Sequence, residues 1–323
     1  MNVGVYFDLR NPPPWRTDPA RLYGFTLELC EEAEHLGAHS VWLSEHHLFE
    51  DGYLPQPLTF AAAVAARTSR VRVGTAVCLA PLRSAVQIAE EVAVVDLVSG
   101  GRVELGLGAG YRIPEFELFD ADIARRYHTT DVRVRELRAL WAEGVVTPAP
   151  VQARVPIWLG YQGPQGARRA GRLGEGLLSV AAAQRDPYLE GLREGGHHPG
   201  LARMAGVVPA YVTEDPEGDW PVVSRHLAYQ LDSYRRYLVE GTDQPTPRPV
   251  DPDKVRARAL SGPLSGFLHA TPEDAAARIR GLVAGAAAET VFLWASIAGM
   301  PEEMAARHVQ TICTQLAPLL ADG

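Results

Sequence analysis

One carboxylate and two histidines stand together in Glu45-His46-His47, directly after the apolar residues 40–43. Residues 40–43 are small, β-branched or large and apolar, which is typical of a buried strand. Neighbouring side chains on an extended backbone point to opposite sides, so one histidine can face a ligand while the other packs into the protein. A zinc site of the HExxH type needs both histidines on one face and a third ligand, which this triplet does not supply. The triplet therefore indicates a general acid or base, or a hydrogen-bond donor to a cofactor, with simple backbone bonding as the alternative.

Two glycine-rich turns are further candidates for ligand contact. Three glycines between residues 160 and 166 separate a predicted strand from a predicted helix, where backbone N–H groups and the helix dipole favour an anion. This turn matches neither the Walker pattern nor GxGxxG, and a plain strand-to-helix turn explains it equally well. Gly108 lies between two more glycines at a strand end, which leaves room for a planar ligand or marks a bulge.

Composition excludes several classes of protein. The net charge is −8 and no basic block occurs, so neither nucleic acid nor an anionic membrane surface is expected as a partner. No run reaches the roughly 18 apolar residues of a membrane span, and the N-terminus does not resemble a signal peptide. The three cysteines are far apart, which predicts reduced, buried thiols in a cytoplasmic protein without a metal site.

The elements that must position these residues alternate regularly between strand and helix. Strands are predicted at residues 3–7, 40–43, 71–79, 102–107, 156–160, 177–180, 204–212 and 290–294. Eight such units favour an α/β fold of the (β/α)8 TIM-barrel type over an open doubly wound sheet. A barrel needs roughly 250 residues. We therefore interpret residues 1–323 as a single domain with insertions at about 111–122 and 241–267.

Helix starts are also predicted. Ser84 and Thr271 are residue types that cap helix N-termini. The acidic residues of the helix after Ser84, among them Glu91, are expected to pair with Arg83 or Arg102 and to be structural.

Taken together, these segments resemble the bacterial-luciferase-like flavin monooxygenase family. The resemblance runs through residues 40–47, 71–77, 87–110, 156–176 and 271–279, in the same order of strands and helices. It implies a TIM barrel that binds reduced FMN at the C-terminal mouth. It also implies His46 as the catalytic residue beside the reactive edge of the flavin, acting as acid or base or stabilising an oxygenated flavin. In the family a non-prolyl cis peptide often lies behind the flavin ring, here expected at Ala76-Val77.

The cofactor residues implied by the resemblance are Ala76, Val77 and Gly108 for the ring and Gln162, Gly163 and Gly166 for the phosphate. One departure concerns the phosphate. Luciferase has a Cys-Arg pair after its fourth strand, and this chain has Gly108-Ala109 there, so phosphate binding rests more on the turn at residues 160–169.

A substrate pocket is predicted from strand-end side chains that could face the mouth: Phe7, Asp8, Tyr111 and Trp294. Aromatic walls suit an apolar or polycyclic compound, and packing at the rim of the barrel is the alternative role for these residues.

Three functions follow from the resemblance. The first is a monooxygenase that uses reduced FMN and O2 on a small, apolar substrate, served by a separate flavin reductase because no NAD(P)H fingerprint occurs. The second is a deazaflavin-dependent hydride-transfer oxidoreductase on the same fold. The third is a non-catalytic flavin-binding protein, which the presence of His46 disfavours. Members of the family often pair through helices near the second and third barrel units, so a homodimer is expected.

Overall fold

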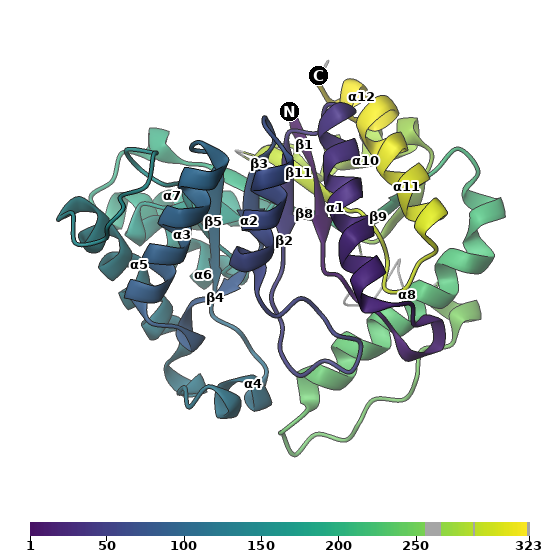
Figure 1. The fold of residues 1–323 in the computed structure, drawn as a ribbon, viewed down its shortest axis with the longest axis horizontal. Helices are drawn as coiled ribbons and strands as arrows, with labels where there is room; N and C mark the ends of the chain where they lie inside the picture. The colour runs from purple at the N-terminus through teal and green to yellow at the C-terminus, as the bar shows by residue number, and fades with distance from the viewer. Residues whose placement is uncertain (256–265, 287, 322–323) are drawn as a thin grey trace.

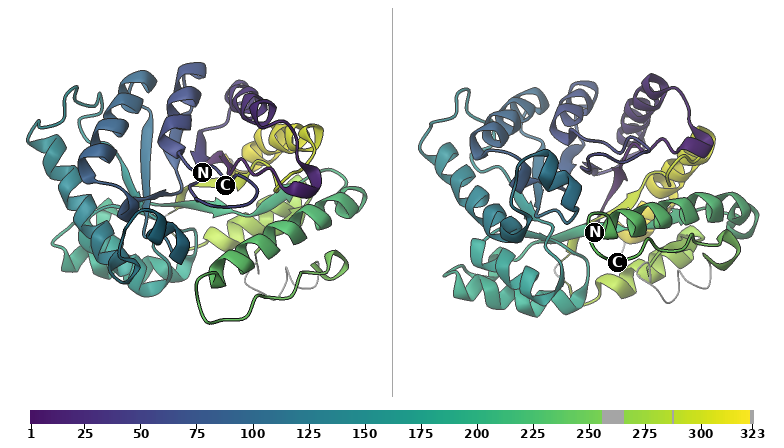
Figure 2. Two further views of the ribbon diagram at one scale, coloured as in Figure 1. Left: turned by 60° about the horizontal axis from the view of Figure 1, so that its bottom comes forward. Right: turned by 90° about the horizontal axis from the view of Figure 1, so that it is seen from below.

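The computed structural model describes residues 1–255, 266–286 and 288–321. Parallel strands in this part of the chain form a closed barrel inside a ring of helices (Figures 1 and 2). The barrel strands are β1 (Asn2–Phe7), β2 (Ser40–Leu43), β3 (Arg72–Thr75), β4 (Cys78–Leu79), β5 (Val103–Gly108), β6 (Ile157–Leu159), β7 (Gly176–Leu178), β8 (Met204–Val208) and β11 (Ala288–Trp294). Both β3 and β4 pair with β5, so they are two pieces of one barrel strand. The predicted TIM barrel is confirmed, and the open sheet is excluded because the pairing of β3 with β5 joins the two ends of the strand order into a ring.

The helices are α1 (Pro19–His35), α2 (Pro57–Arg67), α3 (Ala85–Ser99), α4 (Ile113–Leu118), α5 (Arg126–Ala142), α6 (Gly163–Leu173), α7 (Arg185–Glu194), α8 (Pro216–Val239), α10 (Pro272–Val283), α11 (Glu302–Thr311) and α12 (Ala317–Ala321). Short helical turns are η1 (Pro13–Trp15), η2 (Ala80–Leu82), η3 (Ile123–Arg125), η4 (Ala182–Gln184), η5 (Pro199–Leu201), η6 (Pro252–Lys254) and the π-helical η7 (Ile312–Leu316). The predicted caps are confirmed, because the side chains of Ser84 and Thr271 accept hydrogen bonds from the backbone of the first helical turn. Among the described residues, none of these helices has the length and apolar character needed to cross a bilayer.

Two predicted strands are divided in the structure. The strand predicted at 204–212 ends in the barrel at Val208, and β9 (Ala210–Val212) instead pairs with β10 (Leu268–Ala270) in a separate small sheet. Pro209 lies between them and cannot donate a ladder hydrogen bond. The strand predicted at 71–79 is interrupted at the Ala76-Val77 peptide, which is cis, as expected from the resemblance.

The structure describes the first predicted insertion completely and the second only in part. The first, at 111–122, contains α4. The second, at 241–267, begins directly after α8 and contains η6, and its residues 256–265 lie outside the described part of the chain.

The barrel interior is filled by aromatic side chains. Tyr6, Trp42, Trp158 and Phe292 belong to one buried cluster, and the ring of Trp42 stacks on that of Phe292 with centroids 4.6 Å apart. A Cβ at Gly74 would lie 2.4 Å from the Trp42 ring, so this strand can pass the indole only without a side chain. Because the interior is packed, a ligand has to bind at an end of the barrel rather than inside it.

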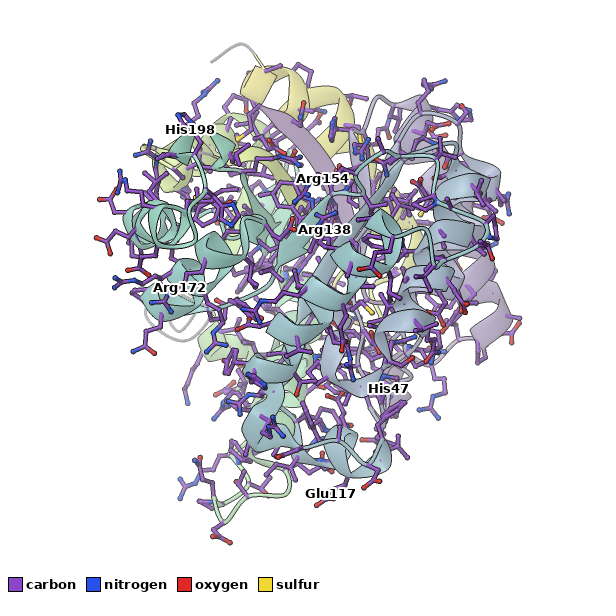
Figure 3. All side chains as sticks on the ribbon, turned by 90° about the vertical axis from the view of Figure 1, so that its left-hand side faces the viewer. His47, Glu117, Arg138, Arg154, Arg172 and His198 are labelled. Atoms are coloured by element: carbon purple, nitrogen blue, oxygen red, sulfur yellow. The ribbon has the colours of Figure 1, made fainter. Side chains whose placement is uncertain are left out.

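The outer surface carries ion pairs that tie helices to the barrel. Arg138 of α5 and Arg154 both contact Glu175, with N–O distances of 2.6 and 3.1 Å. Figure 3 shows Arg138 and Arg154 close together on this side of the molecule, away from His47. The carboxyl ends of the strands point towards the bottom of Figure 1, where α4 and the end of α8 lie, and the N-terminus and α12 lie at the top.

Candidate active site

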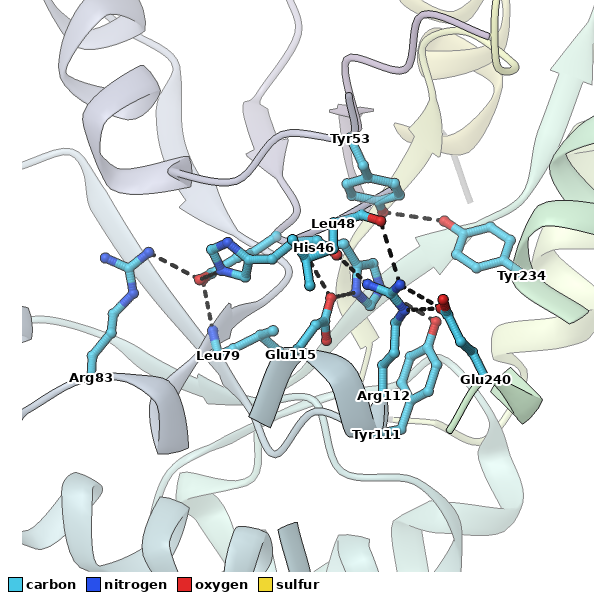
Figure 4. Close-up of polar contacts among 12 residues, drawn as sticks. His46, Leu48, Tyr53, Leu79, Arg83, Tyr111, Arg112, Glu115, Tyr234 and Glu240 are labelled. Carbon is cyan, nitrogen blue, oxygen red and sulfur yellow. Dashed lines mark hydrogen bonds and ion pairs between the residues drawn. The ribbon is translucent and has the colours of Figure 1, made fainter. Parts of the chain in front are cut away.

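His46 lies at the carboxyl end of β2, in the loop that follows the strand. Its Nδ1 is 2.8 Å from Oε1 of Glu115, and its Nε2 is 3.4 Å from the Tyr111 hydroxyl. A carboxylate only accepts hydrogen bonds, so Nδ1 donates to Glu115 and Nε2 is left as the acceptor for Tyr111. Burial raises the pKa of Tyr111 above its usual value, which keeps the phenol in its donating form. The arrangement gives His46 one fixed tautomer with Nε2 available for proton transfer (Figure 4).

Glu115 of α4 is fully buried and joins two neighbouring residues of the histidine loop. Its Oε1 also accepts from the backbone N–H of His47 at 2.8 Å, while its Oε2 has no hydrogen-bond partner among the described residues. Buried polar atoms are normally paired, so the free oxygen is a candidate contact for a ligand or water. Sequence reasoning missed Glu115, because the residue is 69 positions from His46 and lies in a segment interpreted as an insertion.

His47 points away from His46, as the alternation of an extended backbone predicts. Its Nε2 lies 2.9 Å from Oε1 of Glu45. The same carboxylate accepts from Leu79 N–H and from Arg83. The structure therefore assigns the two histidines to different environments, and only His46 contacts Tyr111.

Aromatic rings and α8 cover the histidine loop. The His46 ring stacks on Phe49 at 4.7 Å, and Phe49 packs against Tyr237 of α8 at 3.9 Å. Arg112 is buried against these rings, with its Nε 2.9 Å from Glu240 and its Nη1 bonded to the His47 carbonyl. The last turns of α8 thus hold the loop that carries the catalytic candidate (Figure 4).

The residues expected around a flavin ring lie side by side at the ends of β3, β5 and β6. Ala76 and Val77 are half-buried, although both neighbouring residues of the strand are buried. A Cβ at Gly108 would lie 2.2 Å from Val77 and a Cβ at Gly160 2.6 Å from Val77, so both glycines make room for this side chain. The space predicted beside Gly108 is thus occupied by Val77, and contact of Gly108 with a flavin stays a prediction.

The predicted phosphate turn forms the N-terminus of α6. Gln162 makes no side-chain capping bond, so the first amides of the helix have no side-chain acceptor. Gly163 has a φ of +71°, with open space where its Cβ would stand, whereas a Cβ at Gly166 would lie 2.8 Å from Tyr161. Gly163 therefore allows close approach of an anion, and Gly166 is required by local packing.

The two arginines just inside α6 already have partners. Arg168 pairs with Glu194 and Arg169 with Asp131, which also accepts from Tyr161 at 2.7 Å. These pairs hold α6 against α7 and α5.

Of the four predicted substrate residues, Tyr111 and Trp294 are placed by their contacts, and Asp8 by its position two residues after Tyr6 of the barrel interior. Tyr111 contacts His46, and Trp294 belongs to the same interior cluster as Tyr6. The prediction for Phe7 is corrected. Strand residues alternate between faces, and since Tyr6 is inside the barrel, Phe7 packs outside it with Val3 and Val5. Phe7 lines a separate cavity of about 430 Å³ between β1, α1 and α11.

Asp8 lies in a buried polar cluster that sequence reasoning did not find. Burial raises the pKa of Asp8 to about 7, Asp51 adds to this effect, and Arg10 opposes it. Arg10 binds Asp51 at 2.7 Å and lies 5.1 Å from the Tyr234 ring. Beside it, the hydroxyls of Tyr6, Tyr53 and Tyr234 form a chain with spacings of 3.1 and 3.2 Å. The sequence signal for this cluster was the set of polar residues after β1, which alternation places at the mouth.

No group that could hold a metal ion occurs among residues 1–255, 266–286 and 288–321. The three cysteines are free and buried, as the sequence predicted.

Comparison with known proteins gives this geometry a context. The family model described as luciferase-like monooxygenase matches residues 1–309. A solved monooxygenase from Streptomyces bottropensis has 25% sequence identity and a TM-score of 0.81, with 98% of this chain and 99% of that chain covered.

Two curated relatives differ in their cofactor. An F420-dependent glucose-6-phosphate dehydrogenase from Amycolatopsis mediterranei is 31% identical over 51% of this chain and 56% of its own length. The oxygenase component of a flavin-dependent trigonelline monooxygenase from Acinetobacter baylyi is 35% identical over 30% of this chain and 27% of its own length. The match thus spans about half the length of the first of these relatives and about a quarter of the second.

Proposed function

The chain belongs to the luciferase-like monooxygenase family, and from this premise we propose that it is a monooxygenase that uses reduced FMN and O2 to oxygenate a small, apolar organic substrate. The observation that carries the proposal is the buried His46–Glu115 pair beside the half-buried Ala76-Val77 surface. Solved and curated relatives described as monooxygenases support it.

The residues present fit a bound flavin mononucleotide. The uncapped start of α6, with Gly163 open to its surroundings, would hold the phosphate. Ala76 and Val77 would lie against the ring, and the unpaired Oε2 of Glu115 offers an acceptor nearby. When bound in its reduced form, FMN would supply the electrons that activate O2.

His46 would move a proton at Nε2. Because Glu115 holds Nδ1, the ring cannot turn, and the carboxylate balances the charge gained when Nε2 takes up a proton. Tyr111, on the other side of Nε2, would donate to the substrate or to His46. Phe49 and Tyr237 beside the imidazole exclude water from this side of the ring.

The substrate would lie between Tyr111, Asp8 and Trp294. The aromatic rings of Tyr111 and Trp294 suit an apolar compound, and the pKa of Asp8, raised to about 7, lowers the average charge that the compound would meet near neutral pH.

The proposal is tested by titrating the protein with reduced FMN and with a deazaflavin, using Trp fluorescence, and then adding labelled O2 with a panel of small aromatic compounds. Reduced FMN should bind, and label should enter a product. His46→Gln should lower turnover by about 100-fold or more while FMN affinity stays nearly unchanged. His128→Gln is the matched control, because His128 is an exposed histidine far along the sequence in α5. Turnover unchanged in His46→Gln would remove His46 from the chemistry.

A second candidate is hydride transfer with a deazaflavin, which the F420-dependent relative from Amycolatopsis mediterranei favours. In that reaction His46 would accept the proton of an alcohol while hydride leaves for the cofactor. Tight binding of the deazaflavin without O2 consumption would select this function. Binding of flavin without any turnover would select the third, non-catalytic function.

The expected partners are also proposals. The outer face of α3 carries four apolar side chains that are 43–49% exposed, namely Val86, Val94, Leu97 and Val98. The inner face of the same helix is buried and also apolar. A helix that is hydrophobic on all sides is normally covered, and we propose that a second copy of the chain covers it.

We further propose that a separate reductase supplies reduced FMN. We also propose that the protein is one domain and works in the cytoplasm, where its three free, buried thiols would stay reduced.

A further inference from the structure

Glu45 is buried, with 2% of its surface exposed, and accepts three hydrogen bonds from three segments of the chain. Oε1 accepts from His47 Nε2 at 2.9 Å and from Arg83 Nη2 at 2.9 Å. Oε2 accepts from the backbone N–H of Leu79 at 2.8 Å. The carboxylate therefore links the end of β2 to β4 and to Arg83, which lies just before α3. Figure 4 labels Leu79 and Arg83, two of the three residues that donate to it.

These contacts favour the ionised form of Glu45. Burial alone would raise its pKa, but the hydrogen bond from His47 and the charge of Arg83 outweigh burial, and the pKa lies below its usual value. A buried charge with all its partners in place is costly to disturb, because a neutral side chain would take away the buried anionic partner of Arg83 and leave only the more exposed Glu91 to balance its charge.

The hydrogen bond from Leu79 connects Glu45 to the strand segment that contains Ala76 and Val77. Leu79 is two residues beyond Val77, whose side chain is held between Gly108 and Gly160. At the other end, the N–H of Ala76 donates to the carbonyl of Leu43 at 2.7 Å. The Ala76-Val77 surface is thus fixed by β2 at one end and by Glu45 at the other.

We propose that Glu45 is a positioning residue that fixes the Ala76-Val77 surface relative to His46, and so sets how the flavin ring lies against the protein. The proposal rests on the proposed function, because it concerns the same cofactor site. Glu45 takes no part in proton transfer, since His47 and not His46 is its partner.

The test compares Glu45→Gln with Glu91→Gln. Glu91 pairs with the same guanidinium at 3.3 Å, but its side chain is 33% exposed and its partners are Arg83 and Gln87. Both substitutions remove a negative charge that pairs with Arg83. Only the first also leaves a single acceptor oxygen for Leu79 on one side and for Arg83 and His47 on the other, so one of the two sides loses its acceptor. The probe is FMN itself, titrated in oxidised and reduced form, with the absorption spectrum of the bound flavin recorded at saturation.

Glu45→Gln is expected to weaken FMN binding by about tenfold and to shift the spectrum of the bound flavin, while Glu91→Gln changes the dissociation constant less than about twofold. A loss of general stability would not alter the spectrum of flavin bound to the folded fraction. If Glu45→Gln fails to fold, Glu45→Asp keeps the charge and shortens its reach, and the same spectral shift is expected.

Wild-type affinity and spectrum in a folded Glu45 variant would overturn the proposal. Absence of flavin and deazaflavin binding to the wild-type protein would instead overturn the proposed function, and the positioning role with it.

Discussion

Replacing Asp8 by asparagine is expected to change how the stability of the protein depends on pH. Burial, reinforced by Asp51 and opposed by Arg10, raises the pKa of Asp8 from 3.8 to about 7. The unfolded chain therefore loses this proton near pH 4 and the folded chain near pH 7. Between these values the unfolded state binds fewer protons, so this residue makes the folded state less stable as the pH rises.

The magnitude follows from the pKa difference. At about 1.4 kcal/mol per pH unit, the full penalty above pH 7 is about 4 kcal/mol. Part of it is already present at pH 5, which leaves about 2–3 kcal/mol to develop between pH 5 and pH 8. An asparagine side chain does not titrate, so Asp8→Asn should gain about 2–3 kcal/mol relative to the wild type over this range, whatever its constant packing cost.

The assay is urea unfolding at pH 5, 6.5 and 8, followed by Trp fluorescence, with reversibility checked at each pH. Asp243→Asn is the control, because Asp243 is exposed and its replacement should leave the pH dependence of the wild type intact. A difference in unfolding free energy between Asp8→Asn and wild type that stays constant from pH 5 to pH 8 would refute the reasoning. Asp8 would then carry its charge in the folded protein throughout this range.

Three further results are expected. Val94→Asp combined with Leu97→Asp should convert a dimer to a monomer in sedimentation velocity, because the charges would lie on the exposed face of α3; an unchanged dimer would place the interface elsewhere. Gly108→Ala should cost about 1–3 kcal/mol of unfolding free energy by collision with Val77, and adding Val77→Ala should recover most of it; additive losses in this double-mutant cycle would contradict the contact. The pKa of Glu34 is lowered to about 2, because its carboxylate accepts backbone hydrogen bonds that outweigh burial. Glu34 therefore stabilises the fold above about pH 4 and loses this effect as the pH falls towards 2, so Glu34→Gln should flatten the acid limb of a thermal unfolding series.

Much of the fold could be predicted from local pattern. Strand and helix periods and the caps at Ser84 and Thr271 are determined by nearby residues, and the structure agrees with them. The barrel followed from the alternation of strands and helices, which leaves few ways to pair parallel strands. The break at Pro209 carried a local signal, because proline lacks the N–H that a continuous strand would need.

The candidate site was predictable only in part, because its contacts join distant segments. His46 could be singled out from its own triplet, but Glu115 becomes its partner only when α4 folds back over the loop after β2. The same holds for Arg112 and Glu240, 128 positions apart. For Phe7 the signal was local, since strict alternation along β1 places its side chain on the face opposite to that of Tyr6.

The pairing of β1 with β11 has a consequence for synthesis of the protein. Among the barrel strands, β11 (residues 288–294) is synthesised last. Until then β1 pairs on one edge with β2, the strand that leads to His46, and its other edge is unpaired. The cover over the His46 loop also comes late, because it is supplied by Tyr237 and Glu240 near the end of α8. A nascent chain therefore carries the His46 loop without this cover until Glu240 has been made, and a fragment that ends before β11 has an unpaired strand edge.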